Sequence, residues 1–169
     1  PLYSSAASDV YKRQAPSVEH SDPFGGTADT VVTNPPAKLK VLGPAGPVDP
    51  QLSLLSVRHA DGRPLALLAN YGLHYVGGGA PATASADYFG VFSERVRELL
   101  DGDAAFVAMM SNGASGDVNN SDRRHAGERH PTWEKMQAVA DDLARAATKV
   151  CGDIEYRDRV ELGVAVGKL

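Results

Sequence analysis

The spacing of apolar and polar residues changes several times along the chain, and each change marks an expected element. Residues 52–57 and 64–70 are short, apolar and β-prone. The turn signal Asp61-Gly62 between them predicts a β-hairpin. Residues 87–100 instead place apolar side chains at intervals of three and four, which predicts an amphipathic helix. Its apolar stripe is Phe89, Phe92, Val96, Leu99 and Leu100.

The second half of the chain continues with alternating strand and helix patterns. Residues 104–110 are a continuous apolar run of strand length, typical of a strand buried on both faces. A second helix is expected over 132–150, ended by Gly152, and the alternation in 154–166 predicts a final strand. The expected core stripe of the second helix is Trp133, Met136, Val139, Ala140, Leu143, Ala147 and Val150.

The ends of the first helix carry capping signals. Ser85 or Asp87 is expected to cap its start, because short polar side chains accept hydrogen bonds from the first free N–H groups. Gly102 stands where a left-handed residue is expected to end the helix.

The resulting order is β-β-α-β-α-β, which predicts an α/β domain with a mixed sheet. Strand 64–71, helix 87–100 and strand 104–110 form a βαβ unit, in which a right-handed crossover joins parallel strands. Parallel strands release their loops at the same edge of a sheet, where open α/β sheets bind ligands. We therefore expect loops 72–88 and 111–124 to meet there.

The two ends of the chain do not resemble the ends of a domain. Residues 1–14 have neither helical nor strand periodicity and resemble translated adaptor read-through of the kind found in metagenomic sequences, so we expect a non-native tail that packs on nothing. Residues 15–50 are rich in Pro and Gly and are expected to be extended. The chain stops at Leu169 in an apolar register, which predicts a truncated domain, or alternatively a natural edge strand.

Composition narrows the classes of function. Of 169 residues, 43% are hydrophobic and 22% charged, ordinary values for a globular protein with one sizeable core. The net charge of −4 and the absence of a basic block argue against a nucleic-acid partner. No apolar run approaches the ~18 residues of a membrane span. The single cysteine, Cys151, excludes an internal disulfide and a cysteine-based zinc cluster.

The first loop carries His74 at the exit of its strand. An imidazole there can bind a metal or move a proton near neutral pH, or it can be a structural histidine bonded to the loop. Gly77-Gly78-Gly79 allows a tight turn or a close approach to a ligand. Asp87 stands at a helix N-terminus, where it is either a functional carboxylate or a plain cap.

The second loop places Asp117 and Asn119 near the same edge. We expect these two residues to gather there with His74 and Asp87. The loop lacks the Gly-Lys-Ser/Thr of a phosphate-binding loop. An EF-hand count starting at Asp117 fails because Asp122 stands where that loop needs glycine.

The serines and the remaining histidines of this region are weak candidates for catalysis. Ser111 and Ser115 do not lie in a Gly-x-Ser-x-Gly elbow, which argues against a serine hydrolase. His125 and His130 flank an exposed charged stretch and are expected to be solvated.

Four motifs in these segments resemble the neutral/alkaline (non-lysosomal) ceramidase family. The resemblance covers a stretch of the family's N-terminal catalytic domain, from about Thr33 to the end of the second loop. It implies that residues 51–169 are part of a ceramidase-like catalytic domain. The motifs are Gly46-Pro-Val-Asp-Pro50, Asn70-Tyr-Gly-Leu-His74, Ser85-Ala-Asp-Tyr-Phe-Gly90 and Ser111-Asn…Gly116-Asp-Val118.

The resemblance implies an activity, a cofactor and site residues. Family members are zinc amidases that cleave the N-acyl bond of ceramide to sphingosine and fatty acid, and they are secreted or periplasmic. His74 matches a histidine zinc ligand of the family, while the remaining ligands have no match in this chain. An isolated fragment with one matched ligand is expected to be inactive, since a catalytic zinc takes about three protein ligands. We take Asp117 and Asn119 as candidate catalytic residues.

The chain departs from the family pattern at two places. Tyr75-Val76 follow the histidine where the family has Pro and a small residue. Asn119 stands where ceramidases carry the catalytic serine, and an amide side chain is no nucleophile. Either zinc-bound water, whose pKa falls to about 7, attacks alone, or the substrate is a related lipid amide. Asn119 would then donate a hydrogen bond to the oxyanion.

A competing class of function uses the same edge without chemistry. The loops of a non-enzymatic module would bind a sugar or a protein there without a metal. A further upstream histidine and a downstream Glu and Tyr in a longer reading frame would favour the enzyme.

Overall fold

The computed structural model describes most of the chain from residue 46 onward and short strands before it. The described residues are 3–4, 13–14, 16–21, 27–31, 41–44, 46–77, 83–116, 118–120 and 131–167. The strands are β1 (Tyr3–Ser4), β2 (Arg13–Gln14), β3 (Pro16–Ser21), β4 (Thr27–Val31), β5 (Val41–Pro44), β6 (Leu52–Arg58), β7 (Pro64–Tyr71), β8 (Val107–Asn112) and β9 (Val118–Asn119). The helices are α1 (Asp87–Leu99) and α2 (Thr132–Asp153).

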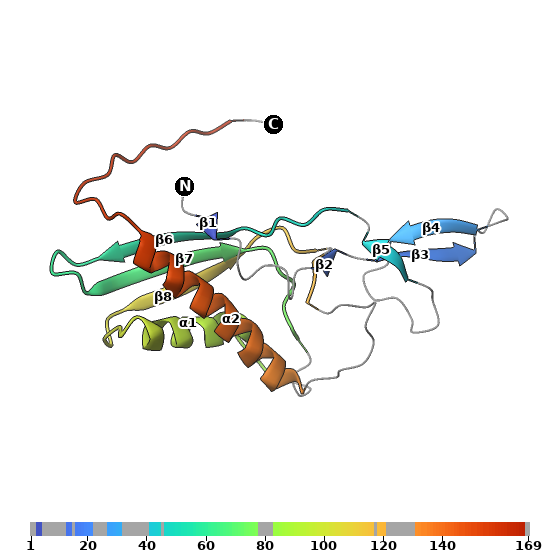
Figure 1. Ribbon diagram of the computed structural model, residues 1–169, viewed down its shortest axis with the longest axis horizontal. Coiled ribbons are helices and arrows are strands. Elements are labelled where there is room, and N and C mark those ends of the chain that lie inside the picture. Colours follow the sequence, from blue (N-terminus) through green and yellow to red (C-terminus); the bar gives the residue numbers. More distant parts are fainter. Residues whose placement is uncertain are drawn as a thin grey trace.

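A mixed sheet of order β1-β6-β7-β8 organises the protein (Figure 1). β6 and β7 form the expected antiparallel hairpin, and β8 runs parallel to β7 after the crossover through α1. The α/β class and the mixed sheet are therefore confirmed. The parallel register pairs Ala66 with Val107 and Tyr71 with Asn112, so β7 and β8 end level with each other.

Both helices belong to one apolar core with the inward face of the sheet. Along β7, Leu67, Ala69 and Tyr71 are buried and alternate with exposed neighbours, which is the pattern of a sheet covered on one side. α1 packs against β8 and α2, and α2 also contacts β6. The largest buried side chains of the helices are Tyr88, Phe92, Val96, Met136, Val139 and Leu143. Neither described helix has the length and apolar character that crossing a bilayer requires.

The expectation that the third strand is buried on both faces is wrong. The strand spans Val107–Asn112 rather than 104–110, and Val107 and Met109 are 49% and 51% exposed. Met109 stands in one row with Leu68 and Leu55 on the uncovered face of the sheet. An apolar run cannot reveal that helices cover only one side of a strand.

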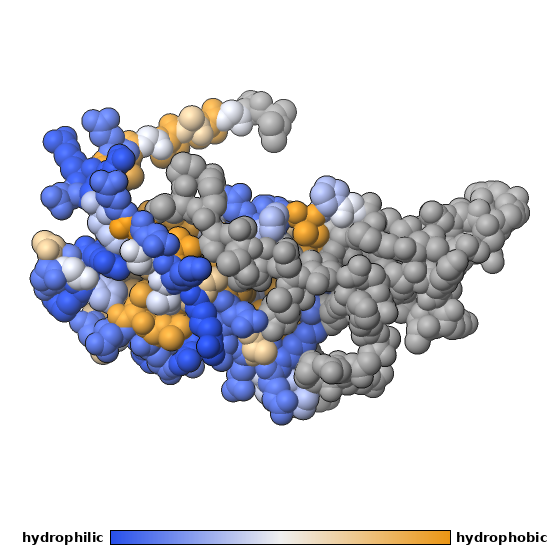
Figure 2. Space-filling view, viewed as in Figure 1, coloured by the Kyte–Doolittle hydropathy of each residue, from blue (hydrophilic) through white to orange (hydrophobic). Residues whose placement is uncertain are grey.

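The expected strand over 154–166 is also wrong. No strand forms within residues 154–167, and the chain runs on as an extended segment beyond α2 (Figure 1). Leu162, Val164 and Val166 are each 93% exposed, and Figure 2 shows this segment as a run of apolar residues in the open. Alternation produces a strand only where a neighbouring strand completes the backbone hydrogen bonds.

α2 is longer than expected and its first aromatic residue lies outside the core. The helix continues through Gly152 to Asp153, because Cys151 is buried and keeps this last turn packed. Trp133 is 55% exposed, since its position in the first turn carries it away from the sheet. The rest of the expected stripe is buried, from Met136 to Val150.

The left-handed residue that ends α1 is Asp101, one position before the glycine expected there. Asp101 has φ 54°, and the N–H groups of Asp101 and Gly102 donate to the carbonyls of Glu98 and Arg97. Gly102 is needed for a different reason. A Cβ on Gly102 would come within 2.7 Å of the Phe106 ring.

The segments before β6 form backbone pairs with other strands, which the sequence did not predict. Tyr3 pairs with Ser53 of β6 and Arg13 pairs with Asn119 of β9, so residues 1–14 do not run free of all contact. Within 15–50, β3 pairs with both β4 and β5 in a separate sheet. That residues 1–14 are non-native stays a prediction, as does the division of the chain into segments at 15 and 51.

Candidate functional site

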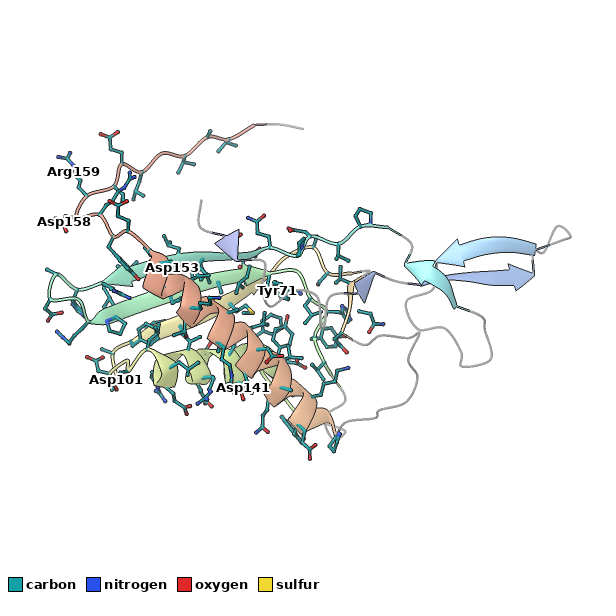
Figure 3. All side chains as sticks on the ribbon, viewed as in Figure 1. Tyr71, Asp101, Asp141, Asp153, Asp158 and Arg159 are labelled. Carbon is teal, nitrogen blue, oxygen red and sulfur yellow. The ribbon has the colours of Figure 1, made fainter. Side chains whose placement is uncertain are left out.

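The candidate site lies where β7 and β8 end together. Tyr71 and Asn112 are register partners, and the N–H of Gly113 donates to the carbonyl of Tyr71 at 3.0 Å. A Cβ on Gly113 would lie 3.1 Å from both the Cα and the N of Gly72. The two loops therefore leave the sheet in direct contact at a pair of glycines. Figure 3 marks this end of β7 with the label of Tyr71, and loop side chains lie beyond it.

His74 is bonded through its backbone to the second loop. Its N–H donates to the carbonyl of Val118 at 3.1 Å, and the N–H of Val118 donates to the carbonyl of Ser115 at 3.2 Å. The imidazole is half-buried and lies against the ring of Tyr75, with centroids 4.3 Å apart at 30°. Tyr75 itself is 54% exposed. The His74 loop and the Asn119 loop thus meet, as expected from the parallel crossover.

Asn119 is one of two buried polar residues in the described part of the chain, the other being Ser115. It is 8% exposed and follows Val118, the residue whose carbonyl binds His74. Asp117, the other candidate catalytic residue, lies outside the described residues. The structure therefore places His74 and Asn119 together and leaves the roles assigned to them as predictions.

Asp87 ties the start of α1 to the loop that carries His74. Its Oδ1 accepts from the N–H groups of Val76 at 2.9 Å and Tyr88 at 2.8 Å, and its Oδ2 accepts from Gly77 at 2.8 Å. Its own N–H donates to the hydroxyl of Ser85 at 3.0 Å. These three backbone donors hold the carboxylate of Asp87 between the loop and the first turn of α1. Asp87 therefore acts as the anchor of the loop. The expectation that Ser85 or Asp87 caps α1 is wrong, because Ala86 occupies the N-cap position and no side-chain capping hydrogen bond forms there.

Tyr88 holds the other side of the same loop. Its buried hydroxyl donates to the carbonyl of Leu73, the residue before His74, at 2.8 Å. Burial raises the pKa of the Tyr88 phenol well above its usual value, and the neighbouring charge of Asp87 adds to the effect. The phenol stays protonated and remains a donor. The sequence did not reveal a role for Tyr88. The only signal was an aromatic residue directly after Asp87 at the start of the helix.

Asn120 is a second residue whose role at the site the sequence did not reveal. Its side-chain amide donates to the carbonyls of Tyr75 at 2.6 Å and His74 at 3.4 Å. Its Oδ1 accepts from the ammonium group of Lys135 in α2 at 2.7 Å. Nothing in the sequence signals this link, because it joins a loop residue to a helix fifteen positions later.

The two serines of the second loop are engaged in structural hydrogen bonds. The Ser111 hydroxyl donates to the carbonyl of Ala69 at 3.3 Å and accepts from the amide of Asn70 at 2.8 Å. The Ser115 hydroxyl accepts from the amide of Asn112 at 2.8 Å. These partners are amides and a carbonyl, none of which can take a proton as a general base. These hydrogen bonds agree with the sequence argument against a serine hydrolase.

His74 does not belong to a complete metal-binding group within the described residues. No group of three or more His, Cys, Asp or Glu side chains that could hold a metal ion occurs there. A catalytic zinc takes about three protein ligands. The described part of the chain therefore does not by itself fit zinc, and His74 is a single candidate ligand.

The fold is similar to that of solved ceramidases. Neutral ceramidase from Pseudomonas aeruginosa matches with a TM-score of 0.53 and 20% identity, over 62% of this chain and 17% of that one. A structure described as ceramidase complexed with C2 matches with a TM-score of 0.55 and 19% identity, over the same shares. The chain thus spans 17% of the length of these proteins, and at this identity the likeness shows the fold. The sequence itself matches no family model and no curated protein at a significant level.

Proposed function

We propose that this chain is part of a zinc-dependent amidohydrolase resembling neutral ceramidase. The reaction is hydrolysis of the N-acyl amide bond of ceramide or a related lipid amide. One observation carries the proposal. In a fold similar to that of neutral ceramidase, His74 and Asn119 come from separate loops and meet at the carboxyl edge of the parallel strands, bonded through Val118.

The proposed roles follow from the chemistry of each side chain. His74 is a metal ligand in this proposal, because histidine is the commonest metal-binding side chain and this residue is half-buried at the exit of a strand. Asn119 donates a hydrogen bond to the oxyanion that forms when the amide carbonyl is attacked. Asp117 is a further candidate catalytic residue from the same loop. Asp87, Tyr88 and Asn120 hold the His74 loop and do not take part in bond breaking.

Zinc is the part of the proposal that needs residues beyond His74. When bound, the metal would act as a Lewis acid on the amide carbonyl and on water. The remaining ligands would come from residues other than those described, since the described ones form no complete group.

The test compares two histidine variants of the full-length natural protein. His74→Ala removes the candidate ligand at the carboxyl edge, and His59→Ala removes a histidine of the β6–β7 turn, at the opposite end of these strands. Zinc content by elemental analysis and hydrolysis of an N-acyl sphingosine are measured for both. We expect His74→Ala to lose zinc and activity while His59→Ala keeps them. Full zinc content and activity in His74→Ala would contradict the proposal, and binding of a sugar or protein without hydrolysis would favour the non-enzymatic module.

A further inference from the structure

The second loop forms hydrogen bonds with the backbone of His74 on both sides of its Cα. Ahead of it, the N–H of His74 donates to the carbonyl of Val118 at 3.1 Å. Behind it, the carbonyl of His74 accepts from the Asn120 amide at 3.4 Å, and the next carbonyl, that of Tyr75, accepts from the same amide at 2.6 Å. The longer bond reaches the peptide that follows His74, and the shorter bond fixes the next peptide, between Tyr75 and Val76. The direction in which the His74 side chain leaves the backbone therefore depends on residues 118 and 120.

Lys135 determines which way the Asn120 amide faces. An ammonium group has three donors and no acceptor, so its partner at 2.7 Å must be the Oδ1 atom of Asn120. The NH₂ group of the same amide is then directed at the two loop carbonyls. Lys135 lies one residue before Met136, which is 1% exposed and anchors this turn of α2 in the core. The position of the His74 peptide is thus connected to the packing of α2.

We propose that Asn120 is a positioning residue for His74, held in its orientation by Lys135. Asn120 acts on the carbonyl side of the turn at residues 74–75, and Asp87 acts on the N–H side at residues 76–77. One backbone group from each of the four consecutive residues 74–77 is therefore held by two side chains, one from the second loop and one from α1. The assignment of His74 as the positioned group rests on the proposed function, whereas the link from Lys135 through Asn120 to the loop does not.

The decisive variant is Asn120→Asp. Aspartate keeps the shape of asparagine and an acceptor for Lys135, but it offers no N–H to the carbonyls of His74 and Tyr75. Lys135→Met removes the group that orients the amide and leaves Asn120 in place. Lys149→Met is the matched control, because Lys149 is an exposed lysine near the other end of α2.

Two measurements on the chain without added metal test the proposal. The first is the amide hydrogen exchange of His74, Val76 and Gly77, expressed as a ratio to that of buried Phe92 in α1. The loss of one hydrogen bond raises this ratio by about tenfold in Asn120→Asp. The second is the ¹H–¹⁵N signals of the His74 imidazole, which shift because the ring leaves its position against Tyr75. Lys135→Met changes both readouts in the same direction by a smaller factor, and Lys149→Met changes neither.

An exchange ratio and imidazole signals equal to those of the unchanged chain in Asn120→Asp would overturn the proposal. Using a ratio to Phe92 keeps the test valid in a destabilised variant, because general unfolding raises both exchange rates together. The outcome is separable from the proposed function. A His74→Ala protein that keeps its zinc and activity contradicts the function, while the exchange ratios report only on the positioning of the loop.

Discussion

Asp87 and Gly77 are joined by a hydrogen bond of 2.8 Å from the backbone N–H of Gly77 to the Oδ2 atom of Asp87. The bond connects the first residue of α1 to the loop that leaves β7, across a segment of ten positions. Both residues have left-handed backbones, with φ 53° at Asp87 and 65° at Gly77. A strained aspartate persists where its side chain compensates through several hydrogen bonds, as it does here.

Asp87→Asn is expected to destabilise the fold by about 1–2 kcal/mol. Asparagine tolerates the left-handed backbone of Asp87. Its amide keeps one acceptor, so the N–H of either Val76 or Gly77 loses its partner. Urea unfolding followed by circular dichroism measures the change. Asp101→Asn is the control, because Asp101 has the same backbone conformation at the end of α1. Equal unfolding free energies for the two variants would contradict the role of Asp87 as the anchor of the loop.

Gly113→Ala is expected to cost about 1–3 kcal/mol, because an added methyl group would press on the backbone of Gly72. The two glycines mark the close approach of the loops, and the nearest atoms belong to the backbone of Gly72, which has little room to shift. Gly116→Ala in the same loop is the matched control, since nothing lies within 4 Å of its Cβ position. Thermal unfolding of the two variants tests the close approach. A Gly113→Ala protein as stable as Gly116→Ala would show that the loops do not meet this tightly.

Tyr88→Phe tests the buried phenol through pH. The pKa of Tyr88 is raised in the folded state by burial, so the folded state holds the phenolic proton more tightly than the unfolded state does. The resulting stabilisation is present below pH ~10 and is lost as the pH rises above this value, where an unfolded tyrosine ionises. The unfolding free energy of the unchanged chain should therefore fall more steeply between about pH 9.5 and about pH 11 than that of Tyr88→Phe.

Tyr88→Phe also removes the hydrogen bond to Leu73. Its expected cost at neutral pH is about 1–3 kcal/mol, because the carbonyl of Leu73 loses a buried donor. Parallel pH profiles for the two proteins would mean that the phenol is accessible to water in the folded state.

Hydrophobic spacing alone located the elements that carry the site. The hairpin, both helices and the parallel strand form within a few residues of their expected bounds, because their apolar positions face one shared core. The spacing failed where the burial of a residue depends on elements other than its own. Val107 and Leu162 both lie in apolar patterns typical of strands, yet Val107 faces the open side of the sheet and Leu162 has no neighbouring strand among the described residues.

The site likewise has one part that the sequence predicts and another part that it does not. The meeting of the His74 and Asn119 loops follows from the parallel pairing of β7 and β8, which the β-α-β order of elements predicts. The contacts within the site do not follow from that order. Whether Asn120 faces solvent or the carbonyl of Tyr75 depends on the backbone path of two loops and on Lys135 in a third element. The sequence pointed to Asp87 as a helix cap, whereas its carboxylate instead binds Gly77, a contact that depends on the conformation of the loop.

Asn119→Ser probes the substrate of the proposed enzyme. The resemblance to ceramidases implies a serine at this place, and Asn119→Ser would put a hydroxyl beside the loop that holds His74. If Asn119 acts as an oxyanion donor, Asn119→Ala keeps zinc and lowers kcat by about 10²–10³, the usual cost of one such donor. Asn119→Ser is then expected to keep zinc as well. Activity on ceramide that appears only in Asn119→Ser would show that the natural substrate is a different lipid amide. Zinc content, kcat and KM of the full-length variants on an N-acyl sphingosine separate these outcomes, and loss of zinc in Asn119→Ala would contradict the oxyanion role by showing that Asn119 supports the metal instead.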